Sequence, residues 1–235
     1  MGDLTEARPL WPAGAGTEHV EARRRLLAAE KELLAQAERV SAARRALPPG
    51  PVLPDYSLAE GPRDLAEDEP VTARALSELF GEHDALVVYH LMFAPDADEA
   101  CPMCSMWVDG FNGVVHHVER RAAFAVVAKA PLPKLRAWGR RRGWNRVRLL
   151  SAHDSAFNGD LAVEGPDGAQ RPGLSVFDRA GDRVRHRYTM QASVDAELPE
   201  RGIDLLSPVW QVLDLVPAGR GDWYAANDYV ASPTS

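Results

Sequence analysis

The chain has 235 residues, is 46% hydrophobic and 26% charged, and carries a formal net charge of −7 at pH 7. This length can bury a normal core, whereas the acidic balance argues against nucleic-acid binding, which depends on a basic surface. No apolar run reaches the roughly 18 residues of a membrane-spanning helix, and the N-terminus lacks the apolar segment of a secretion signal, so we expect a cytoplasmic protein that binds neither nucleic acid nor membrane.

A long helix is predicted from Glu18 to about Leu47, because this stretch lacks glycine and proline and is rich in Ala, Glu, Arg and Leu. Its apolar residues form one stripe, comprising Leu26, Leu27, Leu33, Leu34 and Val40. The stripe could pack on the body of the same chain, or it could join two chains in a homodimer. The segment Pro48–Pro51 ends the helix, and we therefore divide the chain into a helical extension, residues 1–47, and a domain, residues 48–235.

Short apolar runs and helical stretches alternate beyond this boundary. The expected strands are Asp55–Leu58, the buried Ala85–Phe93, the buried Ala123–Ala128, and a hairpin of Gly173–Asp178 with Val184–Tyr188. The expected helices are Thr72–Phe80 with Thr72 as its cap, one that begins at Cys101, Leu132–Arg142, and an amphipathic helix Ile203–Val216. This order predicts an α/β fold whose mixed sheet lies between helices.

The only two cysteines, Cys101 and Cys104, stand three positions apart just after the buried strand. If Cys101 caps the next helix and Pro102 takes its first position, the free N–H groups and the helix dipole lower the pKa of the Cys101 thiol. Cys104 then lies one turn later on the same face and can attack a mixed disulfide at Cys101. We predict Cys101 as nucleophile and Cys104 as resolving thiol, with Pro102 and Met103 among the substrate-contacting residues.

A metal site is the alternative interpretation of this pair, since Cys101, Cys104, His116 and His117 carry zinc-ligand side chains. Adjacent histidines on a helix point about 100 degrees apart, so both could hardly reach one ion. We therefore predict redox chemistry with neither metal nor cofactor. Peroxide reduction lacks specific support, because Asp98 stands where peroxiredoxins carry Thr or Ser, three residues before the reactive cysteine.

Pro172 is the candidate for the cis-proline that thioredoxin-like folds place opposite the Cys-x-x-Cys motif, just before the terminal hairpin. We expect it to contribute to substrate binding. Trp107, Asp109 and His90 also lie near the motif in sequence, and packing or solvation explains each better than catalysis does.

The sequence resembles the DUF899 family of thioredoxin-like proteins, often labelled dithiol-disulfide oxidoreductases. The resemblance covers most of the chain, and the matching segments are Arg45–Gly50, Val88–Phe93, Cys101–Ser105, Ala130–Leu132, Phe157–Asp160, Gly173–Phe177, Arg201–Asp204 and Leu213–Arg220. It implies a thioredoxin-like three-layer core with an N-terminal long helix and a C-terminal extension, and a redox role for both cysteines. This sequence departs from the family at Ala100, where glycine is common, and at Leu161, where an aromatic residue is common.

The sequence thus predicts a dithiol-disulfide oxidoreductase that acts on a disulfide-containing protein or small molecule and receives electrons from a cellular dithiol donor. The alternative is a thioredoxin-fold binding protein that holds a metal or a small ligand at the Cys-x-x-Cys end without turnover.

Overall fold

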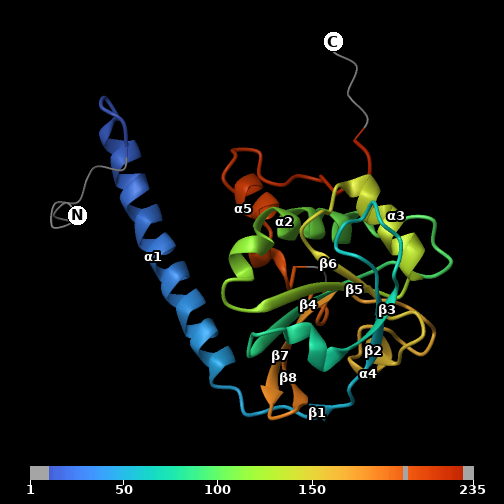
Figure 1. Ribbon diagram of the computed structural model, residues 1–235. Coiled ribbons are helices and arrows are strands. Elements are labelled where there is room, and N and C mark those ends of the chain that lie inside the picture. The colour runs from blue at the N-terminus through green and yellow to red at the C-terminus, as the bar shows by residue number, and fades with distance from the viewer. Residues whose placement is uncertain (1–10, 198–200, 230–235) are drawn as a thin grey trace. The chain divides into compact units, whose positions relative to one another are not determined.

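The structure is a computed structural model that describes residues 11–197 and 201–229, and its chain divides into two compact units, Met1–Pro48 and Pro49–Ser235 (Figure 1). The first unit is built on helix α1, Thr17–Arg45, which confirms the predicted N-terminal helix. No residue of α1 is buried, and Leu33 and Leu34 of its apolar stripe are about two-thirds exposed, at 64% and 66%. Homodimer formation through α1 stays a prediction.

The second unit contains one eight-stranded sheet with the order β1-β8-β7-β4-β5-β6-β2-β3. Its strands are β1 Val52–Leu53, β2 Ser57–Glu60, β3 Thr72–Ala75, β4 Ala85–Leu91, β5 Ala123–Ala128, β6 Arg148–Ser151, β7 Gly173–Ala180 and β8 Arg183–Gln191. Its helices are η1 Leu76–Phe80, α2 Pro102–Val118, α3 Leu132–Arg142, α4 Phe157–Asp160, η2 Asp204–Leu206 and α5 Pro208–Leu213. Among the helices of the described residues, none has the length and apolar character needed to cross a bilayer.

The centre of the sheet has the thioredoxin-like arrangement that the sequence predicts. Strands β4, β5 and β6 are parallel and are connected through α2 and α3, and the antiparallel hairpin of β7 and β8 adds to the other side of β4. Parallel neighbours need crossover helices, whereas the hairpin needs only a tight turn, and Gly181 supplies a positive φ of 68° in that turn. The fold is therefore α/β with a mixed sheet.

Two apolar clusters fill the spaces on opposite faces of the sheet, because successive side chains of a strand alternate between faces. On one face Tyr89 and Leu91 of β4 pack with α2, α3 and α5, and on the other face Leu86 and Val88 pack with η1 and α4 (Figure 1). All six residues of β5 are buried, because apolar clusters cover this strand on both faces of the sheet. The result is three layers.

The predicted helix Thr72–Phe80 is wrong in its first half. Residues Thr72–Ala75 form β3, which pairs antiparallel with β2 from Ser57↔Ala75 to Glu60↔Thr72, and only Leu76–Phe80 turn into a short 3-10 helix. Pairing with a neighbouring strand here overrides local helix propensity. The stop at Gly81 is confirmed, with φ of 53°. Strand β6 and helix α4 are absent from the sequence prediction.

The predicted helix Ile203–Val216 is also wrong in extent, because the structure has η2 and the six-residue α5 instead. Pro208 lacks the N–H that a continuous helix would use, so a helix through this position breaks. The Ser207 hydroxyl then accepts a hydrogen bond from the Val209 N–H at 3.3 Å and caps α5.

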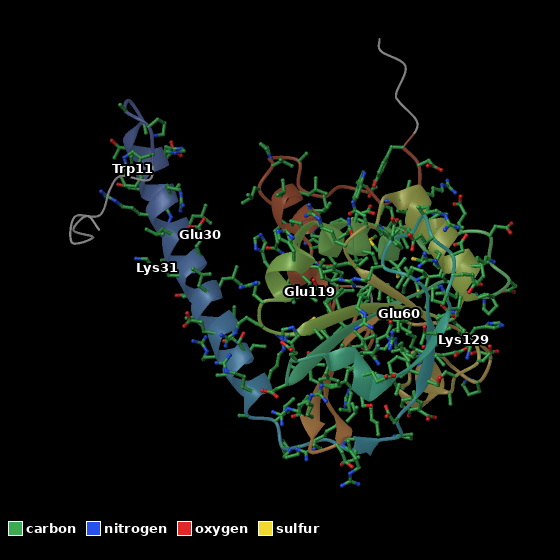
Figure 2. The ribbon with its side chains drawn as sticks, in the orientation of Figure 1. Trp11, Glu30, Lys31, Glu60, Glu119 and Lys129 are labelled. Carbon is green, nitrogen blue, oxygen red and sulfur yellow. The ribbon has the colours of Figure 1, made fainter. Side chains whose placement is uncertain are left out.

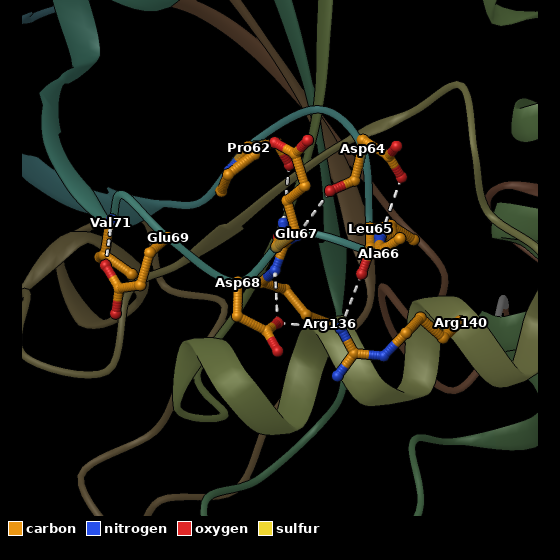
Figure 3. A network of polar contacts seen from close by, with 10 residues as sticks. All are labelled: Pro62, Asp64, Leu65, Ala66, Glu67, Asp68, Glu69, Val71, Arg136 and Arg140. Carbon is orange, nitrogen blue, oxygen red and sulfur yellow. Dashed lines mark hydrogen bonds and ion pairs between the residues drawn. The ribbon is translucent and has the colours of Figure 1, made fainter.

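A buried arginine fastens the loop before β3 to α3 (Figure 3). Arg136 is 2% exposed, and its guanidinium donates to the carbonyl oxygens of Pro62 at 2.8 Å and Asp64 at 2.9 Å, and also to that of Glu67. Arg140 adds a hydrogen bond to the Asp68 carboxylate at 2.9 Å, which lowers the pKa of Asp68. Backbone oxygens thus satisfy a charge that would be costly to bury unpaired.

A second buried charge joins β2 to β6. Glu60, labelled in Figure 2, is 8% exposed and accepts two hydrogen bonds from the Arg148 guanidinium, each at 2.8 Å. Arg74 lies 3.3 Å from the same carboxylate. The bidentate geometry fixes the register of β2, and of β3 paired with it, against β6.

Removal of residues 1–48 is expected to leave a folded domain, because every member of the two apolar clusters lies beyond residue 48. Thermal unfolding of the chain starting at Pro49, followed by circular dichroism, should remain cooperative, with a midpoint within a few degrees of that of the full chain. A broad, non-cooperative transition would show instead that α1 belongs to the core of the domain.

Candidate active site

The Cys-x-x-Cys motif lies where the sequence predicts it, at the start of the helix that follows the central strand. Cys101 is the N-cap of α2 and Pro102 occupies the first turn. The Cys101 N–H donates to the Met92 carbonyl at 3.0 Å, and the Ser105 N–H donates to the Cys101 carbonyl at 2.9 Å. These bonds tie the helix start to the end of β4, so the position of the thiol is set by the sheet.

The two thiols differ in environment although they contact each other. Cys101 is partly exposed, whereas Cys104 is 1% exposed. Burial raises the pKa of the Cys104 thiol well above its ordinary value, and the adjacent Cys101 raises it further. Cys104 is therefore a protonated thiol in the reduced protein, and Cys101 is the thiol that an incoming molecule can reach.

A tyrosine hydroxyl faces the buried thiol from β4. Tyr89 is fully buried, and its hydroxyl has no partner in standard hydrogen-bond geometry among the described residues. Burial holds the pKa of Tyr89 well above its ordinary value, so the hydroxyl stays protonated, and its proximity lowers the pKa of Cys104. Tyr89 is thus a donor in place to bond a thiolate at Cys104.

Pro172 lies on the same edge of the sheet as the cysteines. It directly precedes β7, which runs antiparallel to β4 with Gly173 opposite His90, so the start of β7 meets the end of β4. Among the described residues the only cis peptide bond is Glu69–Pro70, and the expected cis bond at Pro172 is therefore wrong. Pro172 and Met103 line the same cavity as both cysteines, whereas Pro102 does not line it.

That cavity has a volume of about 880 Å³. Much of its wall comes from the C-terminal extension, by which we mean the described residues 201–229. The motif, Met92 and Trp107 form one side, and the ends of the β7–β8 hairpin form another. Three aromatic side chains complete it from the extension, namely Trp210, Trp223 and Tyr224. Ligand pockets in proteins commonly have volumes of about 300–1,000 Å³, so the space suits a small molecule.

An ion-pair cluster joins separate parts of the extension to one another. The Asp204 carboxylate is 7% exposed and accepts hydrogen bonds from Arg201 at 2.8 Å and Arg220 at 2.5 Å. Arg220 also binds Asp214 and lies 4.8 Å over the ring of Trp210. At the start of the extension, the Gly202 N–H donates to the Ala192 carbonyl at 2.7 Å.

Gly202 allows the extension to pass close to the end of β8. A Cβ atom at this position would lie 2.0 Å from the carbonyl oxygen of Gln191, so no larger residue fits without movement of the backbone. Further along, the Asn227 side chain donates to the Ala100 carbonyl at 3.0 Å, next to the motif. The extension is thus attached on both sides of the cavity.

The histidines weighed as zinc ligands lie at the far end of α2. Twelve residues separate Cys104 from His116 along one helix, a distance of about 18 Å at 1.5 Å per residue. Within residues 11–197 and 201–229, no group of three or more His, Cys, Asp or Glu side chains is placed to hold a metal ion. The four residues therefore do not form one site.

The other polar residues near the motif lie outside the cavity. His90 projects to the opposite sheet face from Tyr89, where its Nε2 contacts the Ser175 hydroxyl at 2.7 Å, and burial lowers its pKa to about 3. Asp109 accepts a hydrogen bond from the Trp144 ring N–H at 2.7 Å. Trp107, the third residue near the motif in sequence, does line the cavity, although it is only 3% exposed.

The fold and the site define a thioredoxin-like protein whose Cys-x-x-Cys motif lies in a cavity that the C-terminal extension helps to line. The chain belongs to the family described as bacterial protein of unknown function, DUF899, whose sequence profile matches residues 11–232. No curated protein matches it.

Solved structures with a partial likeness include a reduced 2-Cys peroxiredoxin of Plasmodium vivax, AhpC of Enterococcus faecalis and the peroxidoxin BcpB of Mycobacterium tuberculosis. Their sequence identities are 14%, 13% and 18%, and their TM-scores are 0.46, 0.48 and 0.47. Each covers 67% of this chain, and 90%, 87% and 92% of the respective neighbour is matched. The fold assignment rests on the strand order of this chain itself.

Two features of the site are missing from the sequence prediction. The alternation of β4 places either Tyr89 or His90 under α2, and the sequence does not decide between the two faces. The sequence prediction places Trp210, the first aromatic residue of the 210–224 wall, in the helix Ile203–Val216 and not beside the motif. The signal in the sequence is the richness of this segment in tryptophan and tyrosine.

Limited alkylation should separate the two thiols. In the reduced native protein at pH 7.5, iodoacetamide is expected to modify Cys101 at least roughly tenfold faster than Cys104, because Cys104 is buried and its raised pKa keeps it protonated. Peptide mass spectrometry measures both rates, and the urea-unfolded chain is the control in which they should converge. Equal rates in the native protein would contradict the assigned division between the thiols.

Proposed function

We propose that this protein carries out thiol-disulfide exchange with Cys101 as nucleophile and Cys104 as resolving thiol. The observation that carries the proposal is the pair of contacting thiols, of which one opens into a cavity and the other is buried one helical turn away. A partly exposed cysteine at a helix N-terminus is the environment that favours a thiolate.

The reaction proceeds in two displacement steps. The Cys101 thiolate attacks one sulfur of a disulfide, forms a mixed disulfide and releases the other sulfur as a thiolate. Cys104 then gives up its proton, which the departing sulfur takes, and attacks the Cys101 sulfur; this forms the intrachain disulfide and releases the second sulfur as a thiol. The substrate disulfide gains two electrons and the Cys101–Cys104 pair loses two, which a cellular dithiol donor restores.

Tyr89 assists the second step in this proposal. Cys104 must become a thiolate in an apolar environment, which burial opposes. The protonated Tyr89 hydroxyl beside it is a buried donor whose hydrogen bond lowers the pKa of Cys104 and becomes stronger when that thiol ionises. Tyr89 thus positions and stabilises the attacking thiolate, and no metal or cofactor enters the scheme.

The substrate in this proposal is a disulfide of a protein or a small molecule, and a cytoplasmic dithiol system is the electron source. Pro172 and Met103, which line the cavity beside the thiols, contribute substrate contacts. A second function is favoured by the size of the cavity, namely ligand binding at the Cys-x-x-Cys end without turnover.

Substitution of the resolving cysteine should trap the exchange intermediate. Cys104→Ser is expected to accumulate mixed disulfides with Cys101 in cells, whereas Cys101→Ser should accumulate few, since Cys104 is buried. Non-reducing gels and intact-mass spectrometry of both purified variants measure the adducts, and mass spectrometry identifies them.

The double variant Cys101→Ser/Cys104→Ser is the matched control and should carry no adduct. If neither single variant carries a protein or small-molecule adduct, and the wild-type pair does not cycle between dithiol and disulfide, exchange is not the function. Ligand binding without turnover then takes its place.

Removal of the Tyr89 hydroxyl should slow resolution but not the first attack. Tyr89→Phe is expected to lower the rate of intrachain disulfide formation roughly 10- to 100-fold, since a hydrogen bond to a charged group contributes about 1.5–3 kcal/mol. Stopped-flow tryptophan fluorescence after mixing with an excess of a small disulfide separates the two steps.

Tyr56→Phe is the matched control for this experiment. The Tyr56 hydroxyl donates to Asp160 at 2.8 Å, among residues that pack on the other face of the sheet. Its removal should leave both steps unchanged. A Tyr89→Phe variant that resolves at the wild-type rate would show that the hydroxyl only fills space.

A further inference from the structure

The cavity over Cys101 combines aromatic surface with an excess of positive charge. Trp223 and Tyr224 remain 38% and 56% exposed although they border the cavity, so each keeps ring surface open to solvent. Trp223 packs edge-to-face on Trp210 at 5.4 Å and Tyr229 stacks on it at 6.3 Å, which together fix its ring and leave part of it exposed. Exposed, fixed aromatic rings beside a concave space are a platform on which a flat molecule can stack.

The charges on the cavity wall are three arginines and two aspartates, in a chain whose net charge is −7. Arg201 and Arg220 both bind the Asp204 carboxylate, so their charges are committed to holding the extension. Arg171 differs, because its guanidinium makes no ion pair within the described residues and reaches only the Ala162 carbonyl, at 3.4 Å. It directly precedes Pro172 and lines the cavity on the side of the hairpin.

The wall that the extension forms beside Cys101 also makes the site concave. The extension is attached to the domain through the hydrogen bonds of Gly202 and Asn227, so the opening above Cys101 is a concave space of about 880 Å³ and not a flat surface. A small molecule fits a space of this volume.

We propose that this cavity is a binding site for a small aromatic organic anion, which stacks on Trp223 and places its anionic group at Arg171, next to the Cys101 thiol. This inference rests on the proposed function and deepens it, since the substrate that reacts at Cys101 is then a small disulfide that carries an aromatic ring and an anionic group. The aromatic wall supplies affinity, and the uncommitted guanidinium of Arg171 supplies selectivity for the anion.

Binding of an unreactive probe tests the site apart from any thiol chemistry. Isothermal titration calorimetry of the reduced wild-type protein with 2-naphthoate should show one site per chain. The neutral analogue 2-acetylnaphthalene and the non-aromatic anion cyclohexanecarboxylate should each bind roughly tenfold more weakly, since one lacks the charge and the other the aromatic face.

Two substitutions assign the two halves of the probe. Arg171→Gln should abolish the preference for 2-naphthoate over 2-acetylnaphthalene, whereas Trp223→Leu should abolish the preference over cyclohexanecarboxylate. Arg183→Gln is the matched control, since Arg183 is exposed in the hairpin and does not line the cavity. Saturating 2-naphthoate should also slow alkylation of Cys101 by iodoacetamide at least roughly tenfold, because the bound ring covers the thiol.

The outcomes separate this proposal from thiol exchange. If 2-naphthoate binds as expected but the Cys101–Cys104 pair does not cycle between dithiol and disulfide, the anion-binding site is supported and the proposed exchange function is contradicted. If Cys104→Ser captures a folded protein and 2-naphthoate neither binds nor protects Cys101, exchange stands and the small-anion site is overturned. Equal affinity of all three probes, or no effect of Arg171→Gln, would also overturn it.

Discussion

The buried carboxylate of Asp204 is the interaction on which the architecture of the site depends. It holds Arg201 and Arg220 from two separate parts of the C-terminal extension, and Arg220 in turn stacks on Trp210. Arg220 is the better-buried partner, with a side chain 17% exposed against 62% for Arg201. The Asp204–Arg220 pair therefore contributes most to holding these parts of the extension together beside the cavity, because loss of either partner leaves a poorly solvated charge unpaired.

The asymmetry of the two thiols follows from the same sheet geometry that sets the cavity. Cys101 stands at the end of β4, where the parallel strands end and the terminal hairpin begins, so it meets the opening. One turn later Cys104 points into the apolar cluster beside Tyr89. In the proposed exchange, exposure favours Cys101 for the first attack and burial favours Cys104 for the second, so the fold provides the order of the proposed steps.

The sequence predicts the parts of this structure that depend on local chemistry. Continuous apolar runs indicated β4 and β5, and proline after cysteine indicated the start of α2. It failed where tertiary contacts decide: β3 exists because β2 pairs with it, and the extension divides into η2 and α5 where Ser207 and Pro208 interrupt it. The position of Pro172 was predictable from element order, whereas its trans peptide bond was not.

The polar groups that act on the buried thiol and much of the cavity wall come from different segments of the chain. Burial is the largest cause of the raised pKa of Cys104, and the polar groups that also shift this pKa are Cys101, Tyr89 and the Met92 backbone, none of which belongs to the extension. The extension supplies Trp210, Trp223 and Arg220 to the cavity wall, and Trp210 belongs to the same apolar cluster as Cys104. A change at Trp223 or Arg220 therefore alters the cavity wall without removing any hydrogen-bonding group that acts on Cys104, whereas a change at Trp210 also alters the apolar surroundings of that thiol.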